Sequence, residues 1–157
     1  MHFSDHLYNK FPTLGMAELF NKRNYLVFDN FLPESIVDAL ARECTNWHPD
    51  HPNPFGYFRN MRRFVEEAQS SSTLRWLESA TGVEGIRGEP HLEHAGYGHG
   101  RQPWPNTPTS IAIDLHFGNL AKPVGHKRNN TAHNRCFISR GVLDYTGEVQ
   151  GLRLRYT

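Results

Sequence analysis

The stretch Ile111-Ala112-Ile113-Asp114-Leu115-His116-Phe117 is the clearest strand pattern in the later half of the chain. Successive side chains of a β-strand leave opposite faces of the sheet, so residues two apart share a face. We therefore expect the Asp114 carboxylate and the His116 imidazole to project from the same side. The predictions of the fold and of the candidate chemistry both start from this strand.

Helical patterns come before this strand, and short strand patterns flank it. Helices are expected over residues 14–20 with Thr13 as N-cap, from Pro33 to Cys44, over residues 59–69, and over residues 73–80 with a stop at Gly82. Strands are expected over residues 25–28, 136–138 and 152–156. Helices first and short strands later predict an α+β domain with a β core, a single domain over residues 1–157.

Composition excludes several classes of protein. The 157 residues include 38% hydrophobic and 21% charged residues, which is compatible with a packed core, and the formal net charge is only +1. That balance argues against nucleic-acid binding through a broad basic face. No apolar run approaches the roughly 20 residues that span a bilayer. The start of the chain lacks a signal-peptide pattern, and Cys44 and Cys136 do not make a disulfide scaffold, so a cytoplasmic location is expected.

The Asp114 and His116 pair is the first candidate site. A carboxylate and an imidazole on one face, joined by a second histidine, supply the three protein ligands of a mononuclear non-haem iron. Other positions of the metal then remain for a co-substrate and oxygen. The alternative is structural, in which Asp114 caps a turn and His116 borders the core.

Two further groups of residues carry candidate chemistry. His91, His94 and His99 could bind zinc, although the Cys-x-x-Cys and His-Glu-x-x-His spacings are absent, which favours a structural or supporting role. Arg153 and Arg155 alternate on the last strand, where a guanidinium beside a metal could hold a dicarboxylate through two hydrogen bonds. The alternative is that both arginines are solvated on an edge strand.

A family resemblance joins these segments. The stretch Tyr25-Leu26-Val27-Phe28-Asp29-Asn30-Phe31-Leu32-Pro33-Glu34 resembles the opening strand and helix of iron(II)- and 2-oxoglutarate-dependent oxygenases of the prolyl-4-hydroxylase type. Residues 77–82, followed by Glu89-Pro90-His91-Leu92 and Gly96-Tyr97, are similar to the segment that leads into the metal-bearing strand of those enzymes. Residues 134–138 and 152–157 resemble their late strands.

The resemblance implies a fold, two cofactors and a site. The fold would be N-terminal helices packed on a double-stranded β-helix (jelly-roll) core. The activity would be Fe(II)- and 2-oxoglutarate-dependent hydroxylation, or another oxidation, of a small-molecule or peptide substrate. Asp114 and His116 would be metal ligands, His133 or His126 would be the third ligand, and Arg153 would hold the carboxylate of 2-oxoglutarate.

The sequence also departs from the family pattern. The family carries His-x-Asp or His-x-Glu on the metal strand, whereas this chain has the order Asp114-Leu115-His116, and no histidine follows His133. Residues 119–134 are almost wholly polar, so we expect a jelly roll that is incomplete or built from unusual strands. An open sheet edge would favour a homodimer. These departures leave a second interpretation, a catalytically inactive, truncated oxygenase-like module for binding or assembly.

Overall fold

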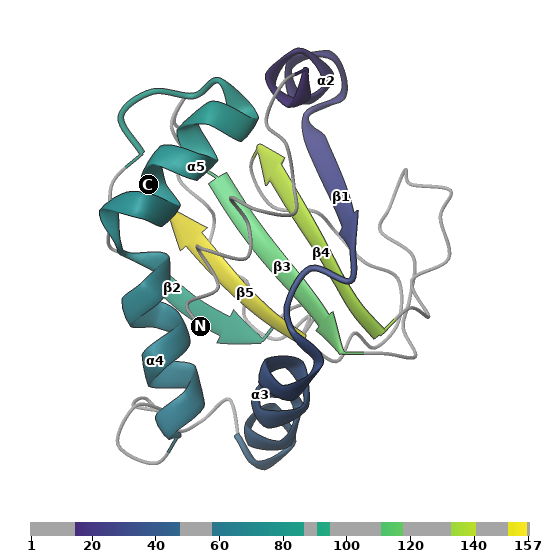
Figure 1. Ribbon diagram of the computed structural model, residues 1–157, viewed down its shortest axis with the longest axis vertical. Coiled ribbons are helices and arrows are strands. Elements are labelled where there is room, and N and C mark those ends of the chain that lie inside the picture. The colour runs from purple at the N-terminus through teal and green to yellow at the C-terminus, as the bar shows by residue number, and fades with distance from the viewer. Residues whose placement is uncertain are drawn as a thin grey trace.

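The computed structural model describes residues 15–47, 58–86, 91–94, 111–117, 133–140 and 151–156. These residues form the helices α2 (Met16–Arg23), α3 (Glu34–Asn46), α4 (Arg59–Ala68) and α5 (Ser71–Thr81) and the strands β1 (Tyr25–Asp29), β2 (His91–His94), β3 (Ile111–Phe117), β4 (His133–Arg140) and β5 (Gly151–Tyr156). Helices on an antiparallel sheet confirm the predicted α+β class (Figure 1). No helix among these residues has the length and apolar character needed to cross a bilayer.

The five strands form one antiparallel sheet in the order β1-β4-β3-β5-β2. The predicted strand β3 is at its centre, where Ile113 pairs with Ile138 of β4 and with Leu154 of β5. Consecutive strands are not always neighbours in the sheet. In this order, β5 lies between β2 and β3, and β3 lies between β4 and β5. Such crossings are typical of Greek-key sheets rather than of successive hairpins.

The boundaries of α3 and α5 follow local signals in the sequence. Pro33 precedes the first turn of α3, where a missing backbone N–H costs nothing. The Oγ of Ser70 caps α5 by accepting a hydrogen bond from the Thr73 backbone N at 3.3 Å. Gly82 ends α5 in the left-handed conformation, with φ of 71°, which glycine adopts without strain.

The first described helix differs from its prediction. α2 extends through Arg23, beyond the expected end at residue 20, and Asn24 ends it in the left-handed conformation. Asparagine tolerates that conformation better than most residues, so Asn24, the last of the polar residues 21–24, is the one that ends the helix. The expected N-cap, Thr13, lies outside the described residues, and Gly15 precedes the helix instead.

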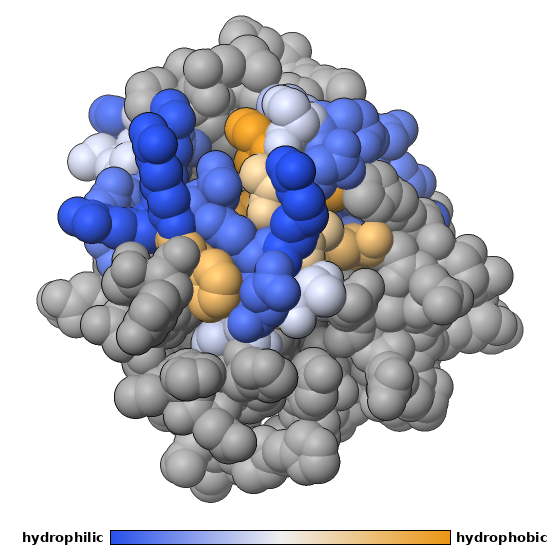
Figure 2. All heavy atoms as spheres, turned by 90° about the horizontal axis from the view of Figure 1, so that it is seen from below, coloured by the Kyte–Doolittle hydropathy of each residue, from blue (hydrophilic) through white to orange (hydrophobic). Residues whose placement is uncertain are grey.

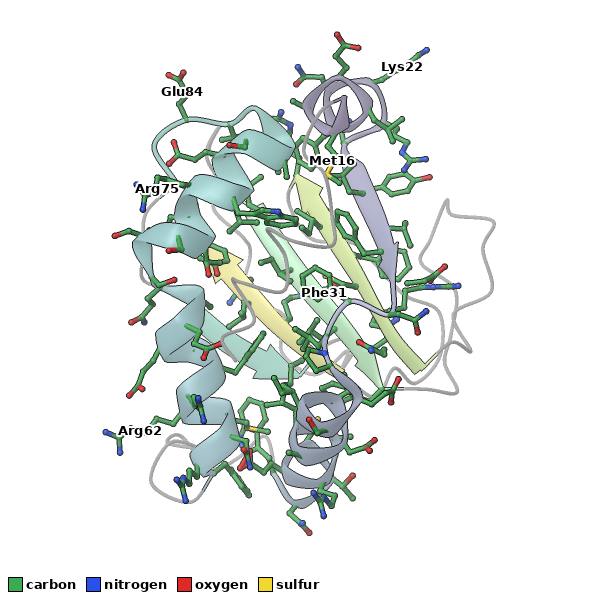
Figure 3. All side chains as sticks on the ribbon, viewed as in Figure 1. Met16, Lys22, Phe31, Arg62, Arg75 and Glu84 are labelled. Carbon is green, nitrogen blue, oxygen red and sulfur yellow. The ribbon has the colours of Figure 1, made fainter. Side chains whose placement is uncertain are left out.

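The hydrophobic core lies between the helices and one face of the sheet. The buried faces of all four helices join the alternate residues Ile111, Ile113, Leu115 and Phe117 of β3 in one cluster. Phe31 points into this layer, whereas the labelled charged side chains on the helices point away from it (Figure 3). The core therefore uses only one face of β3, and the other face is left for different chemistry.

Candidate functional site

The face of the sheet turned away from the helices is polar and buried. Because β3, β4 and β5 are in register, Asp114, His116, Ser139, Arg153 and Arg155 all occupy positions on this face. Asp114 and His116 have no exposed surface, and Arg153 and Arg155 are 3% and 9% exposed. We call these five residues the polar face. Burying charge is unfavourable unless the charge is paired and hydrogen-bonded, so such a cluster is unusual in a purely structural layer.

Asp114 and Arg153 form a buried ion pair at the centre of the polar face. They stand directly opposite each other on β3 and β5. The Arg153 Nε donates to Asp114 Oδ1 at 2.7 Å, and Nη2 donates to Oδ2 at 2.9 Å. Two parallel bonds of this kind are the strongest arrangement of these groups. The pair therefore competes with the predicted role of Asp114 as a metal ligand.

His116 lies beside this pair as a neutral imidazole. Its ring is 5.0 Å from the Phe137 ring, measured between centroids. Burial lowers the pKa of His116 from 6.5 to about 4, Asp114 opposes this shift, and Arg153 and Arg135 add to it. At neutral pH the ring is uncharged and keeps a nitrogen lone pair, which is the form that binds metal ions. His116 therefore has the chemistry expected of a ligand.

Gly151 allows β5 to approach β3 closely next to His116. A Cβ at position 151 would collide with the backbone carbonyl oxygen of Leu115. The carbonyl oxygen of Gly151 accepts a hydrogen bond from Cys44 Sγ at 3.5 Å. Burial raises the pKa of the Cys44 thiol to about 12, so the thiol stays protonated and can donate. This contact connects α3 to the start of β5, the strand that carries both arginines.

A β-bulge at Asn134 ties β4 to the loop before α3. Its backbone is left-handed, with φ of 63°. Its side chain accepts a hydrogen bond from the Leu32 backbone N at 2.9 Å and donates one to the Leu32 carbonyl at 2.6 Å. The bulge falls between the residues that pair with His116 and with Phe117. Asn134 therefore holds β4 in place where it passes the polar face.

The other predicted metal ligands are described only in part. The backbone of His133 pairs with Phe117, next to His116, and its side chain lies outside the described residues, as do His126 and His99. Within the described part of the chain, no group of three or more histidine, cysteine, aspartate and glutamate residues is arranged to hold a metal ion. His116 and Asp114 are the members of the predicted iron site that the structure brings together.

Arg153 and Arg155 are not surface residues, so the alternative of a solvated edge strand is wrong. β5 lies between β3 and β2, and its six residues are all buried. The backbone of Arg155 pairs with Ala112 on one side and with His91 on the other. Both guanidinium groups therefore belong to the interior of the domain.

A separate cavity of about 240 Å³ lies between α3 and α4. Pro33, Ile36 and Phe64 supply apolar wall, and Asn60 and Arg63 are among its polar residues. Seen from below in Figure 2, hydrophobic atoms are visible between hydrophilic side chains. The cavity is on the helix side of the sheet, opposite the polar face, so the two are different features.

No protein-family model matches the chain, and a search of the curated proteins finds no match. The functional assignment therefore depends on the geometry of the polar face. Ser139, Asn134 and Gly151 are among the residues of this region to which the sequence analysis assigns no chemical role. Ser139 lies two residues after Phe137, which pairs with Asp114, and this spacing in β4 indicates that Ser139 shares the polar face.

Proposed function

We propose that the chain is an oxygenase of the Fe(II)- and 2-oxoglutarate-dependent type, which oxidises a small molecule or peptide at the polar face. The sheet supports this proposal because its strand crossings and its two buried faces suit one sheet of a jelly roll. In that fold, the face away from the helices is directed toward a second sheet. A site between two sheets is enclosed, as small-molecule sites usually are.

The observation that carries the proposal is the chemistry of the polar face. An imidazole, a carboxylate and two guanidinium groups are buried together on the two adjacent strands β3 and β5. A neutral imidazole suits a first-row metal ion, and guanidinium groups suit a dicarboxylate. Burial excludes water, which strengthens each of these electrostatic contacts.

The described residues fit the two cofactors unequally. His116 fits Fe(II), and Arg153 and Arg155 fit 2-oxoglutarate, because charge and burial suit each partner. Asp114 does not fit Fe(II), because its two carboxylate oxygens accept hydrogen bonds from Arg153. Bound together, Fe(II) and 2-oxoglutarate would supply an oxidant made from O₂. The residues of the chain would bind both groups and exclude water from the site.

The same ion pair favours a second candidate function, an oxygenase-like module that binds a partner or ligand without iron. In that case Asp114 and Arg153 are a structural pair that replaces a metal site. The protein would then fold and function with no metal present.

An anaerobic titration with Fe(II) and 2-oxoglutarate separates the two candidates. The oxygenase proposal predicts a weak visible charge-transfer band that saturates at one equivalent of Fe(II) and is lost in His116→Ala. Arg62→Ala, which changes a side chain 65% exposed on α4, is the matched control and should keep the band. A folded wild-type protein with no band would reject the oxygenase proposal and leave the metal-free module.

A further inference from the structure

β1 is an outer strand of the described sheet, and alternate residues of β1 direct their backbone groups outward (Figure 1). The Asn24 carbonyl, at the start of the strand, accepts a hydrogen bond from the Arg140 backbone N of β4 at 2.9 Å. Along an antiparallel pair, residues that exchange backbone hydrogen bonds alternate with residues that do not. The backbone N–H and C=O groups of Tyr25, Val27 and Asp29 are therefore directed away from β4.

The outer edge of β1 lacks the features that usually protect an edge strand. Such strands often carry lysine, proline or a β-bulge, which discourage pairing with another chain. Neither lysine nor proline occurs in Tyr25-Leu26-Val27-Phe28-Asp29, and the register with β4 is continuous. Within the part of the chain that the structure describes, no strand pairs with this edge, and the Val27 side chain is half-buried. The edge is therefore regular enough to pair with another antiparallel strand.

The two ends of this edge carry opposite charges. At the start, the Arg23 Nε donates to the Tyr25 carbonyl at 3.2 Å, and the Arg23 Cζ is 4.6 Å from the centroid of the Tyr25 ring. At the other end, Asp29 Oδ1 accepts from Arg135 Nε at 2.7 Å, while the Asp29 side chain is 53% exposed. A guanidinium has five N–H groups and a carboxylate has two oxygens, so each group can make a further contact.

We propose that two copies of the chain associate through their β1 edges, about a two-fold axis that passes beside Val27. Antiparallel pairing about this axis places Val27 opposite Val27 of the second copy, where each N–H donates to the carbonyl of the other. It also places Tyr25 opposite Asp29 of the second copy. The Arg23 guanidinium on the Tyr25 ring then meets that carboxylate, and the symmetry of the dimer forms this contact twice.

The charges select this arrangement over the parallel one. Parallel pairing of two β1 edges would place Arg23 beside Arg23 and Asp29 beside Asp29, and like charges repel across an interface. The antiparallel dimer joins the two sheets into one continuous sheet and keeps the helices of both copies on the same side. This is the homodimer expected of an open sheet edge, and it does not depend on the proposed function.

A backbone variant tests whether the β1 edge is the interface. Sedimentation equilibrium of the full chain should show an average mass that rises with concentration from 18.1 kDa toward twice that value. Val27→Pro removes an N–H that is directed outward, so it breaks the contact between copies without removing a hydrogen bond to β4. Val27→Pro should stay monomeric, whereas the matched control Val27→Thr, which keeps the N–H, should dimerise like the wild type.

A pair of charge variants tests the register and also covers the case in which Val27→Pro does not fold. Arg23→Glu and Asp29→Lys each place like charges together twice in a homodimer, and each should weaken self-association by about 10- to 100-fold. An equimolar mixture of the two should dimerise again, because both contacts between the different copies are then attractive. Lys22→Glu makes the same change of charge on α2, where the side chain points away from the sheet (Figure 3), and should have no effect.

Three results would overturn the proposal. A wild type that stays monomeric up to about 1 mM would show that a second copy does not bind this edge. Undiminished dimerisation of a folded Val27→Pro variant would place the interface elsewhere. A dimeric wild type whose two charge variants do not associate when mixed would reject the antiparallel register at Val27.

Discussion

Removing the carboxylate at position 114 should destabilise the fold far more than removing the ion pair as a whole. Asp114→Asn removes the negative charge that accepts two hydrogen bonds from the Arg153 guanidinium, in a pair whose side chains are only 1% and 4% exposed. Breaking a buried pair from one side costs about 3–5 kcal/mol. For a domain of this length, about 2–4 °C of melting temperature is lost per kcal/mol, so Tm should fall by about 6–20 °C.

Replacing both partners should restore most of that stability. In Asp114→Leu/Arg153→Met neither charge is left unpaired, and such exchanges are often neutral or stabilising. Urea unfolding of the metal-free wild type, Asp114→Leu, Arg153→Met and the double variant would complete a double-mutant cycle. We expect the double variant to be within about 1–2 kcal/mol of the wild type, a range that reflects imperfect repacking.

The outcome that would refute this reasoning is additivity. If Asp114→Leu and Arg153→Met each cost less than about 1 kcal/mol, and the double variant costs their sum, the pair behaves like a solvent-exposed one. Asp29→Asn, which breaks the half-exposed pair with Arg135, shows the size of that effect in the same sheet. Its expected cost is about 1 kcal/mol or less.

Three further predictions follow from single contacts. Gly151→Ala should lower the free energy of unfolding by about 1–3 kcal/mol or more, because the new Cβ would collide with the Leu115 carbonyl. An unchanged midpoint of urea unfolding would contradict the close approach of β5 to β3. Asn134→Ala should lower the free energy of unfolding by about 2 kcal/mol in the same assay, since it removes two buried hydrogen bonds to Leu32. A decrease of less than about 0.5 kcal/mol would show that these two bonds do not hold β4 in place. The pKa of His116 is lowered from 6.5 to about 4 in the folded state, so the unfolded chain takes up a proton first as the pH falls. The free energy of unfolding should therefore decrease by about 3 kcal/mol between pH 6.5 and pH 4. His116→Gln should remove that part of the pH dependence, and an identical pH profile in the variant would show that another group is responsible.

Local patterns were sufficient to predict most of the elements of the fold. The alternation over residues 111–117 predicts β3 and places Asp114 and His116 on one face, because a strand has a period of two whatever its neighbours are. The apolar positions from Ile36 to Cys44 predict α3 for the equivalent reason in a helix. Asn24 illustrates a weaker signal, because several polar residues in a row do not indicate which of them ends α2.

Long-range pairing was not predictable from the same patterns. Arg153 and Asp114 are 39 positions apart, and only the register of β3 with β5 brings them together. The arginines of β5 look like edge-strand residues in the sequence, whereas the sheet order places β5 between two other strands. The bulge at Asn134 likewise depends on a side chain meeting Leu32, 102 positions earlier. Each of these features is fixed by topology, which one sequence does not encode in a local pattern.

The most direct test of the proposed function is a crystal structure of the protein grown anaerobically with Mn(II) and 2-oxoglutarate. The proposed iron site predicts an anomalous metal peak within about 2.0–2.3 Å of an imidazole nitrogen of His116, by analogy with other first-row metal sites. It also predicts a 2-oxoglutarate carboxylate on Arg153, with Asp114 still bound to the same guanidinium. Crystals grown with both additives that hold no metal at His116 would contradict the proposed function.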